Sequence, residues 1–250
     1  MRTESRDNDG VISKVLFVRN DLTATEAMLA DVFAECGFDI DTFDVVAPER
    51  DDRPGGEVTF PDPTGYDVIV PLGAHWAVYD EALRNSWVEA EMAMVRRAVE
   101  AGVGVLGVCF GGQLIAQALG GSVTRSPAPE VGWYDVTTDD EQLIPGGRWF
   151  QWHFDRWTLP PGAIEIARTP AASQAFVLGT ALALQFHPEL DSGLLEVWLA
   201  HDHDGAVAAV GRSHDELRLE TREFSGDAAA RLRTLVRGFL SRVVRTQPST

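Results

Sequence analysis

The feature that most constrains the fold of this chain is a series of short, continuously apolar segments that alternate with segments of helical periodicity. Continuous apolar runs are typical of strands buried on both faces, as in a parallel sheet covered by helices. We therefore expect an α/β fold with a mostly parallel central sheet and helices on both faces. The expected strands of the first half are residues 14–19, 38–43, 67–72 and 104–108, and the expected helices are residues 24–36 and 87–101.

The second half of the chain is richer in strand signals, and helical periodicity returns near its end. No internal repeat and no linker interrupts this pattern, so we predict one domain over residues 13–246, between flexible tails at residues 1–12 and 247–250. Further strands are expected at residues 131–137, 148–152, 175–178 and 181–186, and further helices at residues 194–200 and 227–244.

Charge and cysteine content exclude several classes of function. The 250 residues carry a formal net charge of -17, and so acidic a chain repels phosphate backbones, which makes nucleic acid an unexpected partner. No apolar run approaches the ~18 residues of a membrane span, and the polar N-terminus does not resemble a signal peptide. The only two cysteines, Cys36 and Cys109, form neither a disulfide framework nor a zinc motif. We therefore expect a cytoplasmic protein that needs no metal and no cofactor.

One of these cysteines stands at the corner between the apolar strand of residues 104–108 and the helical segment that follows it. Gly107 and Gly111 lie two residues to either side of Cys109, which is the spacing of a nucleophile elbow. Such a sharp turn strains the backbone and leaves no room for side chains on its flanks, a requirement that glycine meets. The start of a helix also favours a thiolate, and the free N–H of Phe110 is placed to bind an oxyanion.

Two other interpretations of this segment stay open on its own residues. Cys109 could be a buried core cysteine in a glycine-rich turn, since cysteine is often buried. The glycines could also form a phosphate-binding loop. However, the spacing of Gly107, Gly111 and Gly112 matches neither the dinucleotide-binding fingerprint nor the P-loop, and the acidity of the chain disfavours phosphate as well.

A second motif offers the base that a thiol nucleophile requires. Gln185-Phe-His187-Pro-Glu189 follows an apolar strand, at the strand end where active sites of parallel α/β sheets collect. His187 could act as the base and Glu189 as the group that orients it. A His-Pro-Glu sequence alone is more typical of a surface turn, and it is the cysteine elbow that favours the catalytic interpretation.

Taken together, the segments from Gly107 to Gln113 and from Leu184 to Glu189 resemble the paired signature of class I (triad-type) glutamine amidotransferases. The resemblance covers roughly residues 15–198, and within the family it is closest to proteins similar to the glutaminase domain of GMP synthetase. It implies a flavodoxin-like three-layer sandwich. It also implies that Cys109 forms a γ-glutamyl thioester, that His187 transfers protons, and that Glu189 orients His187.

The same resemblance implies further site residues. The oxyanion hole would consist of the backbone N–H groups of Phe110 and of the turn Gly73–Ala74, and substrate contacts would come from Gln113, Gly111, Glu130, Gly132 and Trp133. The chain departs from the family in one place, because relatives usually have Gly-Gly-Pro where this sequence has Gly73-Ala74-His75. Alanine cannot adopt glycine-only angles, so this turn could be set differently. His75 could then face the solvent or touch the substrate.

For the other candidate histidines, a structural role is the preferred interpretation. His153 is expected to position a loop and is a weaker candidate base than His187, while His201, Asp202 and His203 are more typical of a solvated helix end than of a metal site.

Three functions remain open. The first is a glutaminase that passes ammonia to a synthetase, which would be a separate protein because no ATP-binding segment is recognisable. The second is a stand-alone γ-glutamyl peptide or γ-glutamyl amine hydrolase with the same triad. The third is an inactive regulatory module.

Overall fold

The computed structural model of the protein describes residues 13–47, 55–203 and 205–244. The flexible tails expected at residues 1–12 and 247–250 lie outside these residues. Strands and helices alternate in the first half: β1 (Lys14–Arg19), α1 (Ala27–Glu35), β2 (Asp39–Asp44), η2 (Pro63–Gly65), β3 (Val68–Pro71), α2 (Glu81–Leu83), η3 (Arg84–Val88), α3 (Glu89–Glu100), β4 (Gly104–Val108) and α4 (Phe110–Ala118). The second half contains β5 (Ser122–Thr138), β6 (Gly147–Thr158), β7 (Ile164–Arg168), β8 (Ser173–Leu178), β9 (Ala181–Leu184), α5 (Ser192–Ala200), α6 (Ala206–Ala209), α7 (His214–Phe239) and η4 (Leu240–Val244).

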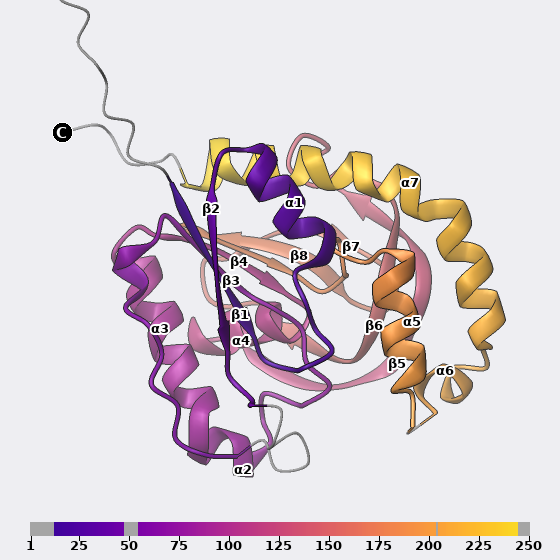
Figure 1. Ribbon diagram of the computed structural model, residues 1–250, viewed down its shortest axis with the longest axis horizontal. Coiled ribbons are helices and arrows are strands. Elements are labelled where there is room, and N and C mark those ends of the chain that lie inside the picture. Colours follow the sequence, from indigo (N-terminus) through magenta and orange to yellow (C-terminus); the bar gives the residue numbers. More distant parts are fainter. Residues whose placement is uncertain (1–12, 48–54, 204, 245–250) are drawn as a thin grey trace, which may run out of the picture.

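The strands form one sheet of nine in the order β2-β1-β3-β4-β9-β8-β7-β5-β6 (Figure 1). The pairs from β2 to β9 are parallel, whereas the pairs from β9 to β6 are antiparallel. The sheet is therefore parallel from β2 to β9, a part that the first half of the chain builds together with β9, and the prediction of a mostly parallel sheet holds for that part. The reason lies in the connections: only Gly179 and Thr180 join β8 to β9, and a parallel pair would require a much longer crossover.

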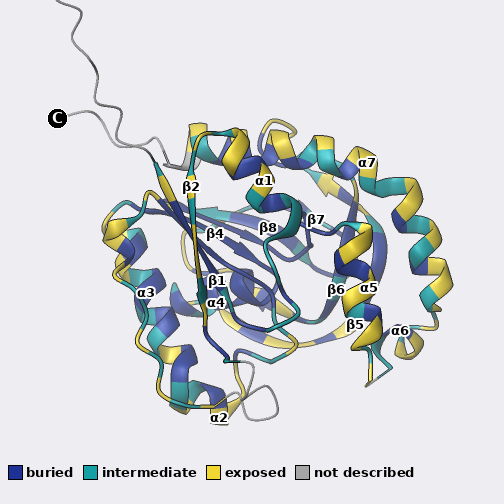
Figure 2. Ribbon diagram, viewed as in Figure 1, coloured by how far each residue is buried: buried dark blue, intermediate teal, exposed yellow. Residues whose placement is uncertain are grey.

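Helices cover both faces of the sheet, as the sequence predicts. In β1, Val15 and Phe17 pack in the core formed with α1 and α7, while Leu16 and Val18 pack in the core formed with α3 and α4. Figure 2 shows buried residues along the central strands and exposed residues on the outward surfaces of the helices. The result is the three-layer arrangement expected for a strand that is apolar on both sides.

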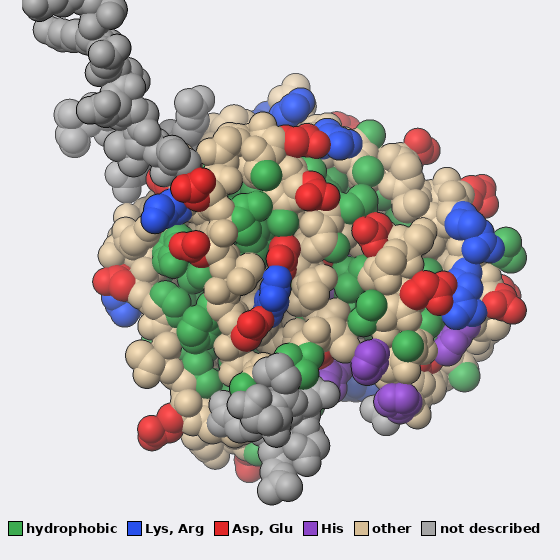
Figure 3. Space-filling view, in the orientation of Figure 1, with side chains coloured by type: hydrophobic (Ala, Val, Ile, Leu, Met, Phe, Trp, Pro, Cys, Tyr) green, Lys and Arg blue, Asp and Glu red, His purple; other side chains and the backbone are tan. Residues whose placement is uncertain are grey.

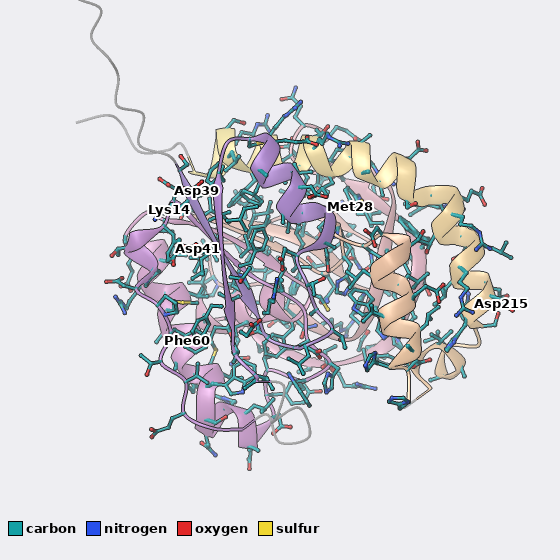
Figure 4. The ribbon with its side chains drawn as sticks, in the orientation of Figure 1. Lys14, Met28, Asp39, Asp41, Phe60 and Asp215 are labelled. Carbon is teal, nitrogen blue, oxygen red and sulfur yellow. The ribbon has the colours of Figure 1, made fainter. Side chains whose placement is uncertain are left out.

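One edge of the sheet is protected by charge. The edge strand β2 pairs only with β1 in the sheet, and its Asp39 and Asp41 are exposed (Figure 4). Carboxylates on an edge strand discourage pairing with a strand of another molecule. Among the described residues, no helix is both long enough and apolar enough to cross a membrane.

Some element boundaries differ from the sequence prediction. Helix α7 begins at His214 and not at residue 227, and its start is marked by a capping box between Ser213 and Glu216. Strand β5 begins at Ser122 and not at residue 131, and β7 was not expected. The first part of β5 and the beginning of α7 contain few apolar residues, so apolar periodicity does not reveal them. β7 does carry an alternating pattern, Ile164-Glu165-Ile166, which could have revealed it.

Candidate active site

Cys109 occupies the turn between β4 and α4 in a strained backbone conformation. Its φ is 51° and its ψ is -106°, and its N–H donates to the Leu184 carbonyl at 2.8 Å. The flanking glycines have no room for a side chain: a Cβ on Gly111 would lie 2.0 Å from the Pro71 carbonyl oxygen, and one on Gly107 would lie 2.5 Å from the Gly111 oxygen. This is the geometry that a nucleophile elbow requires.

His187 and Glu189 face this turn from the end of β9. Nδ1 of His187 donates to Oε1 of Glu189 at 2.7 Å, and the His187 N–H donates to the Phe150 carbonyl at 2.8 Å. Burial by itself would lower the pKa of His187, but the charges of Glu189 and Cys109 and the hydrogen bonds with both raise this pKa well above its usual range. The imidazole is therefore held between the Glu189 carboxylate and the Cys109 sulfur, which favours its protonated form.

Trp198, which the sequence does not single out, packs against the His187 ring. The rings of Trp198 and His187 meet edge to face with centroids 4.7 Å apart, and the Trp198 indole N–H donates to the Thr23 carbonyl at 2.9 Å. Helix α5 carries Trp198, so this helix contributes to the site although its sequence shows only apolar periodicity.

A cavity of roughly 370 Å³ opens above these groups. It reaches Cys109 and His187, and its wall includes Gly73 and Ala74, the turn that the sequence leads us to expect as part of an oxyanion hole. Histidine side chains gather near the ends of α5 and α6 on this side of the molecule (Figure 3). The remaining lining residues are Asp21, Thr23, Ala24, His75, Trp152, Trp198, His201, Asp202, His203 and Ala206.

The turn Gly73-Ala74-His75 is fixed by a carboxylate. Both the backbone N–H and Nδ1 of His75 contact Oδ2 of Asp21. Burial would raise the pKa of Asp21, but the hydrogen bonds from His75 and Thr23 and the charge of His75 together lower it to about 2. Among the described non-glycine residues, only Ala27 and Cys109 have a positive φ, so Ala74 takes its place without that strain. His75 lines the cavity although its side chain is 56% exposed.

The five expected substrate contacts are not among the residues that line the cavity; these are Gln113, Gly111, Glu130, Gly132 and Trp133. Gln113 is buried, and its Nε2 donates to Oε1 of Gln185 at 3.3 Å. The Trp133 indole donates to Oγ1 of Thr221 at 2.9 Å, and a Cβ on Gly132 would lie 2.9 Å from the Arg212 guanidinium. The Gln113 side chain thus contacts the protein interior, whereas Trp133 and Gly132 lie against α7 and the residue before its cap.

Glu130 belongs to a buried polar network. Its Oε2 accepts hydrogen bonds from Nε2 of His153 at 3.0 Å, Oγ1 of Thr169 at 3.0 Å and Nε2 of Gln174 at 2.8 Å. Nδ1 of His153 donates to the Asp155 carbonyl at 2.9 Å. His153 therefore has a structural position, as the sequence indicated.

The segment after α5 is a solvated helix end at His201 and His203, which are both exposed as the sequence indicated, but Asp202 is not solvated. The Asp202 side chain is only 3% exposed, and it accepts hydrogen bonds from the Ala206 N–H at 2.6 Å and from Nε2 of His214 at 3.0 Å. His201 and His203 line the mouth of the cavity. The structure brings them there because Asp202 ties the loop to α6 and α7. Within the described part of the chain, no three His, Cys, Asp or Glu side chains are arranged to hold a metal ion.

Comparison with known proteins accounts for this geometry. The family model for glutamine amidotransferase class-I matches residues 27–201. This chain belongs to the class I glutamine amidotransferase family. The fold agrees, since the crystal structure of a glutamine amidotransferase from Thermotoga maritima has a TM-score of 0.79 and 25% sequence identity, and the match covers 92% of this chain and 99% of that one.

The curated relatives of this class I glutamine amidotransferase include larger proteins. The GMP synthase (glutamine-hydrolyzing) of Aeropyrum pernix is 34% identical over 145 residues, which are 53% of this chain and 28% of that protein. A glutamine-hydrolyzing GMP synthase subunit of Sulfurisphaera tokodaii is 37% identical over 94 residues, which are 34% of this chain and 50% of that subunit. The match thus spans half or less of the length of these relatives.

Proposed function

We propose that this protein hydrolyses the γ-amide of L-glutamine to glutamate and ammonia through a covalent thioester on Cys109. One observation carries the proposal: the His187 ring donates a hydrogen bond to Glu189 at 2.7 Å and lines the same cavity as Cys109. Both residues lie beside Gly73, where a Cβ would be 3.2 Å from Cε1 of His187 and 3.8 Å from Cβ of Cys109. A nucleophile, a base and an orienting carboxylate in this order are the parts that thiol-based amide hydrolysis requires.

The reaction would follow from these positions. The Cys109 thiolate attacks the γ-carbonyl carbon, and the resulting oxyanion accepts hydrogen bonds from the Phe110 N–H and from the turn Gly73–Ala74. The C–N bond then breaks while His187 gives its proton to the leaving nitrogen, so that ammonia departs and the thioester remains. Water attacks the thioester, His187 takes the water proton, and cleavage of the C–S bond releases glutamate and restores the thiolate.

The ammonia would pass to a separate synthetase. Supporting this view, relatives named GMP synthase match this chain over only part of their length, and the name of one of them describes it as one subunit of that enzyme. The reaction uses no metal and no cofactor, and a free thiol suits the reducing cytoplasm, where we place the protein.

A second candidate is hydrolysis of a γ-glutamyl amine or γ-glutamyl peptide. It is favoured by the lining of the cavity, which extends from Cys109 and His187 to the exposed residues His201 and His203. The same triad would serve, and only the leaving amine would be larger than ammonia. An inactive regulatory module is a poorer fit, because it would have no use for a strained cysteine beside a His–Glu pair.

Glutamate release from L-glutamine and from a panel of γ-glutamyl amines and peptides tests these proposals, with Cys109→Ala as the control. Turnover of glutamine that depends on Cys109 supports the glutaminase. Faster Cys109-dependent turnover of a γ-glutamyl amine or peptide favours the second candidate. Turnover that persists in Cys109→Ala would contradict both.

A further inference from the structure

A buried glutamine contacts the sulfur of the proposed nucleophile. Nε2 of Gln185 lies 3.7 Å from Sγ of Cys109 in hydrogen-bonding geometry, and the Gln185 side chain is completely buried. The steps assigned to Cys109, His187 and Glu189 leave this amide without a role. The same sulfur lies 3.7 Å from the Trp152 carbonyl, to which the thiol form can donate. Because a thiolate can only accept hydrogen bonds, the Gln185 amide nitrogen is the group of these two that is suited to the charged form of the sulfur.

The contact follows from the topology of the sheet. β4 and β9 are parallel neighbours in which Val108 pairs with Leu184, so the next residues, Cys109 and Gln185, leave adjacent strand ends side by side. The Cys109 N–H donates to the Leu184 carbonyl at 2.8 Å, and the Gln185 N–H donates to the Gln174 carbonyl at 2.9 Å. Both backbones are therefore anchored where the amide meets the sulfur.

Gln113 determines which end of the Gln185 amide faces the sulfur. Its Nε2 donates to Oε1 of Gln185 at 3.3 Å, which engages the oxygen and leaves the amide nitrogen for Cys109. Gln113 is itself only 3% exposed, and its backbone N–H donates to the Cys109 carbonyl at 2.9 Å. The three side chains thus form a continuous series from Gln113 through Gln185 to Cys109.

A buried thiolate needs such donors, because burial removes the water that would otherwise solvate it. We propose that Gln185 is a further catalytic residue whose amide donates a hydrogen bond to the Cys109 thiolate, and that Gln113 is a positioning residue that holds this amide in its donating orientation. The inference rests on the proposed role of Cys109 as nucleophile. No proton moves along this contact: the N–H bond of Gln185 stays intact while the sulfur forms and breaks its bond to the γ-glutamyl carbon. A hydrogen bond to a charged sulfur is stronger than one to a thiol, so the contact favours the thiolate.

Alkylation of Cys109 by iodoacetamide over a series of pH values tests this without any substrate. A Cys36→Ser background leaves a single reactive thiol. Gln185→Leu should move the midpoint pH of alkylation upward by about one to two units, which means roughly tenfold to a hundredfold less thiolate at a pH below the midpoint. Gln185→Met, which keeps an unbranched side chain of similar length without a donor, should do the same. Gln113→Leu should cause a smaller shift in the same direction, because it frees the amide to rotate.

The outcomes separate the alternatives. A wild-type midpoint in a folded Gln185→Met or Gln185→Leu variant overturns the proposal, and the Met variant decides the matter if the Leu variant does not fold. A Gln113→Leu variant with a wild-type midpoint but a raised KM for glutamine would show that Gln113 contacts the substrate and does not position Gln185. Shifted midpoints in a protein that cleaves no γ-glutamyl compound would uphold the contact and refute the proposed reaction, so the two failures are distinguishable.

Discussion

Glu189 accepts the Nδ1–H of His187 at 2.7 Å, and these two side chains are only 1% and 5% exposed. Each therefore depends on the other, because a buried charge without a partner is strongly destabilising. This pair fixes the direction in which His187 presents its other ring nitrogen. The proposed mechanism depends on that direction.

Truncation of the three proposed catalytic side chains should give graded losses. Cys109→Ala and His187→Ala should each lower kcat by at least ~10⁴-fold. The loss of kcat in Glu189→Ala should be smaller by a factor of roughly 10², since an orienting group is less essential than a nucleophile. Steady-state glutamate release measures all three variants. Equal losses for Glu189→Ala and Cys109→Ala would assign Glu189 more than an orienting role.

The isosteric variant Glu189→Gln should change the pH profile as well as the rate. The Glu189 charge helps to raise the pKa of His187, so its removal should lower that pKa. If His187 must be protonated to release ammonia, the alkaline limb of the kcat profile should move to lower pH in the variant. An alkaline limb at the wild-type position would mean that another group controls it.

Gly111→Ala should unfold or strongly destabilise the protein, because the new Cβ would lie 2.0 Å from the Pro71 carbonyl oxygen. The same substitution at Gly226 is the matched control: this residue is exposed in α7, and a Cβ there would meet nothing within 4 Å. Gly226→Ala should stabilise the protein by about 0.5–1 kcal/mol. Thermal melting followed by circular dichroism compares the two. Similar melting temperatures would contradict the close packing of the elbow against β3.

Glu91 should make the stability of the protein fall as the pH rises. Burial raises the pKa of this carboxyl from its ordinary 4.5 to about 8, although the Asn20 hydrogen bond opposes the shift. The folded protein then keeps the proton up to about pH 8, while the unfolded chain loses it above pH 4.5. The contribution of Glu91 to the free energy of unfolding is therefore greatest below pH 4.5. It decreases as the pH rises from 4.5 to about 8.

Glu91→Gln should remove this pH dependence and keep a side-chain oxygen for Asn20. Between pH 5 and pH 8 the variant should gain up to about 4 kcal/mol of stability relative to the wild type. Urea unfolding at a series of pH values measures the difference. Glu100→Gln, in the same helix at an exposed position, is the control and should keep the decrease in stability between pH 5 and pH 8. Parallel pH curves for Glu91→Gln and the wild type would refute the assignment.

Glu130→Gln should reduce stability and leave the KM of the folded enzyme unchanged. One carboxylate oxygen accepts hydrogen bonds from His153, Thr169 and Gln174, and an amide cannot satisfy all of these donors equally. We expect a loss of roughly 2–4 kcal/mol in the free energy of unfolding. Glu223→Gln, exposed on α7, serves as the control. A raised KM with unchanged stability would instead support the substrate contact that the family resemblance implies.

The apolar strands of the first half could be predicted because they are buried on both faces. β1 and β4 begin and end at the residues expected from the sequence. β5 gave a weaker signal, since its first part has exposed residues and a register shift between Arg125 and Glu130. The early start of α7 had one available signal, the Ser213–Glu216 capping box, which apolar periodicity cannot detect.

The sequence by itself determined the alternation of strands and helices, the cysteine elbow and the His-Pro-Glu motif, because each depends on neighbouring residues. Only the tertiary structure decided what surrounds them. Asp21 and Trp198 lie after a strand and in a helix, and no local pattern relates them to Cys109. Gln185 belongs to the recognised motif, but its contact with Cys109 depends on the pairing of β4 with β9. They meet because parallel strands bring their carboxyl ends to one edge of the sheet, where packing of α5 closes the wall of the cavity.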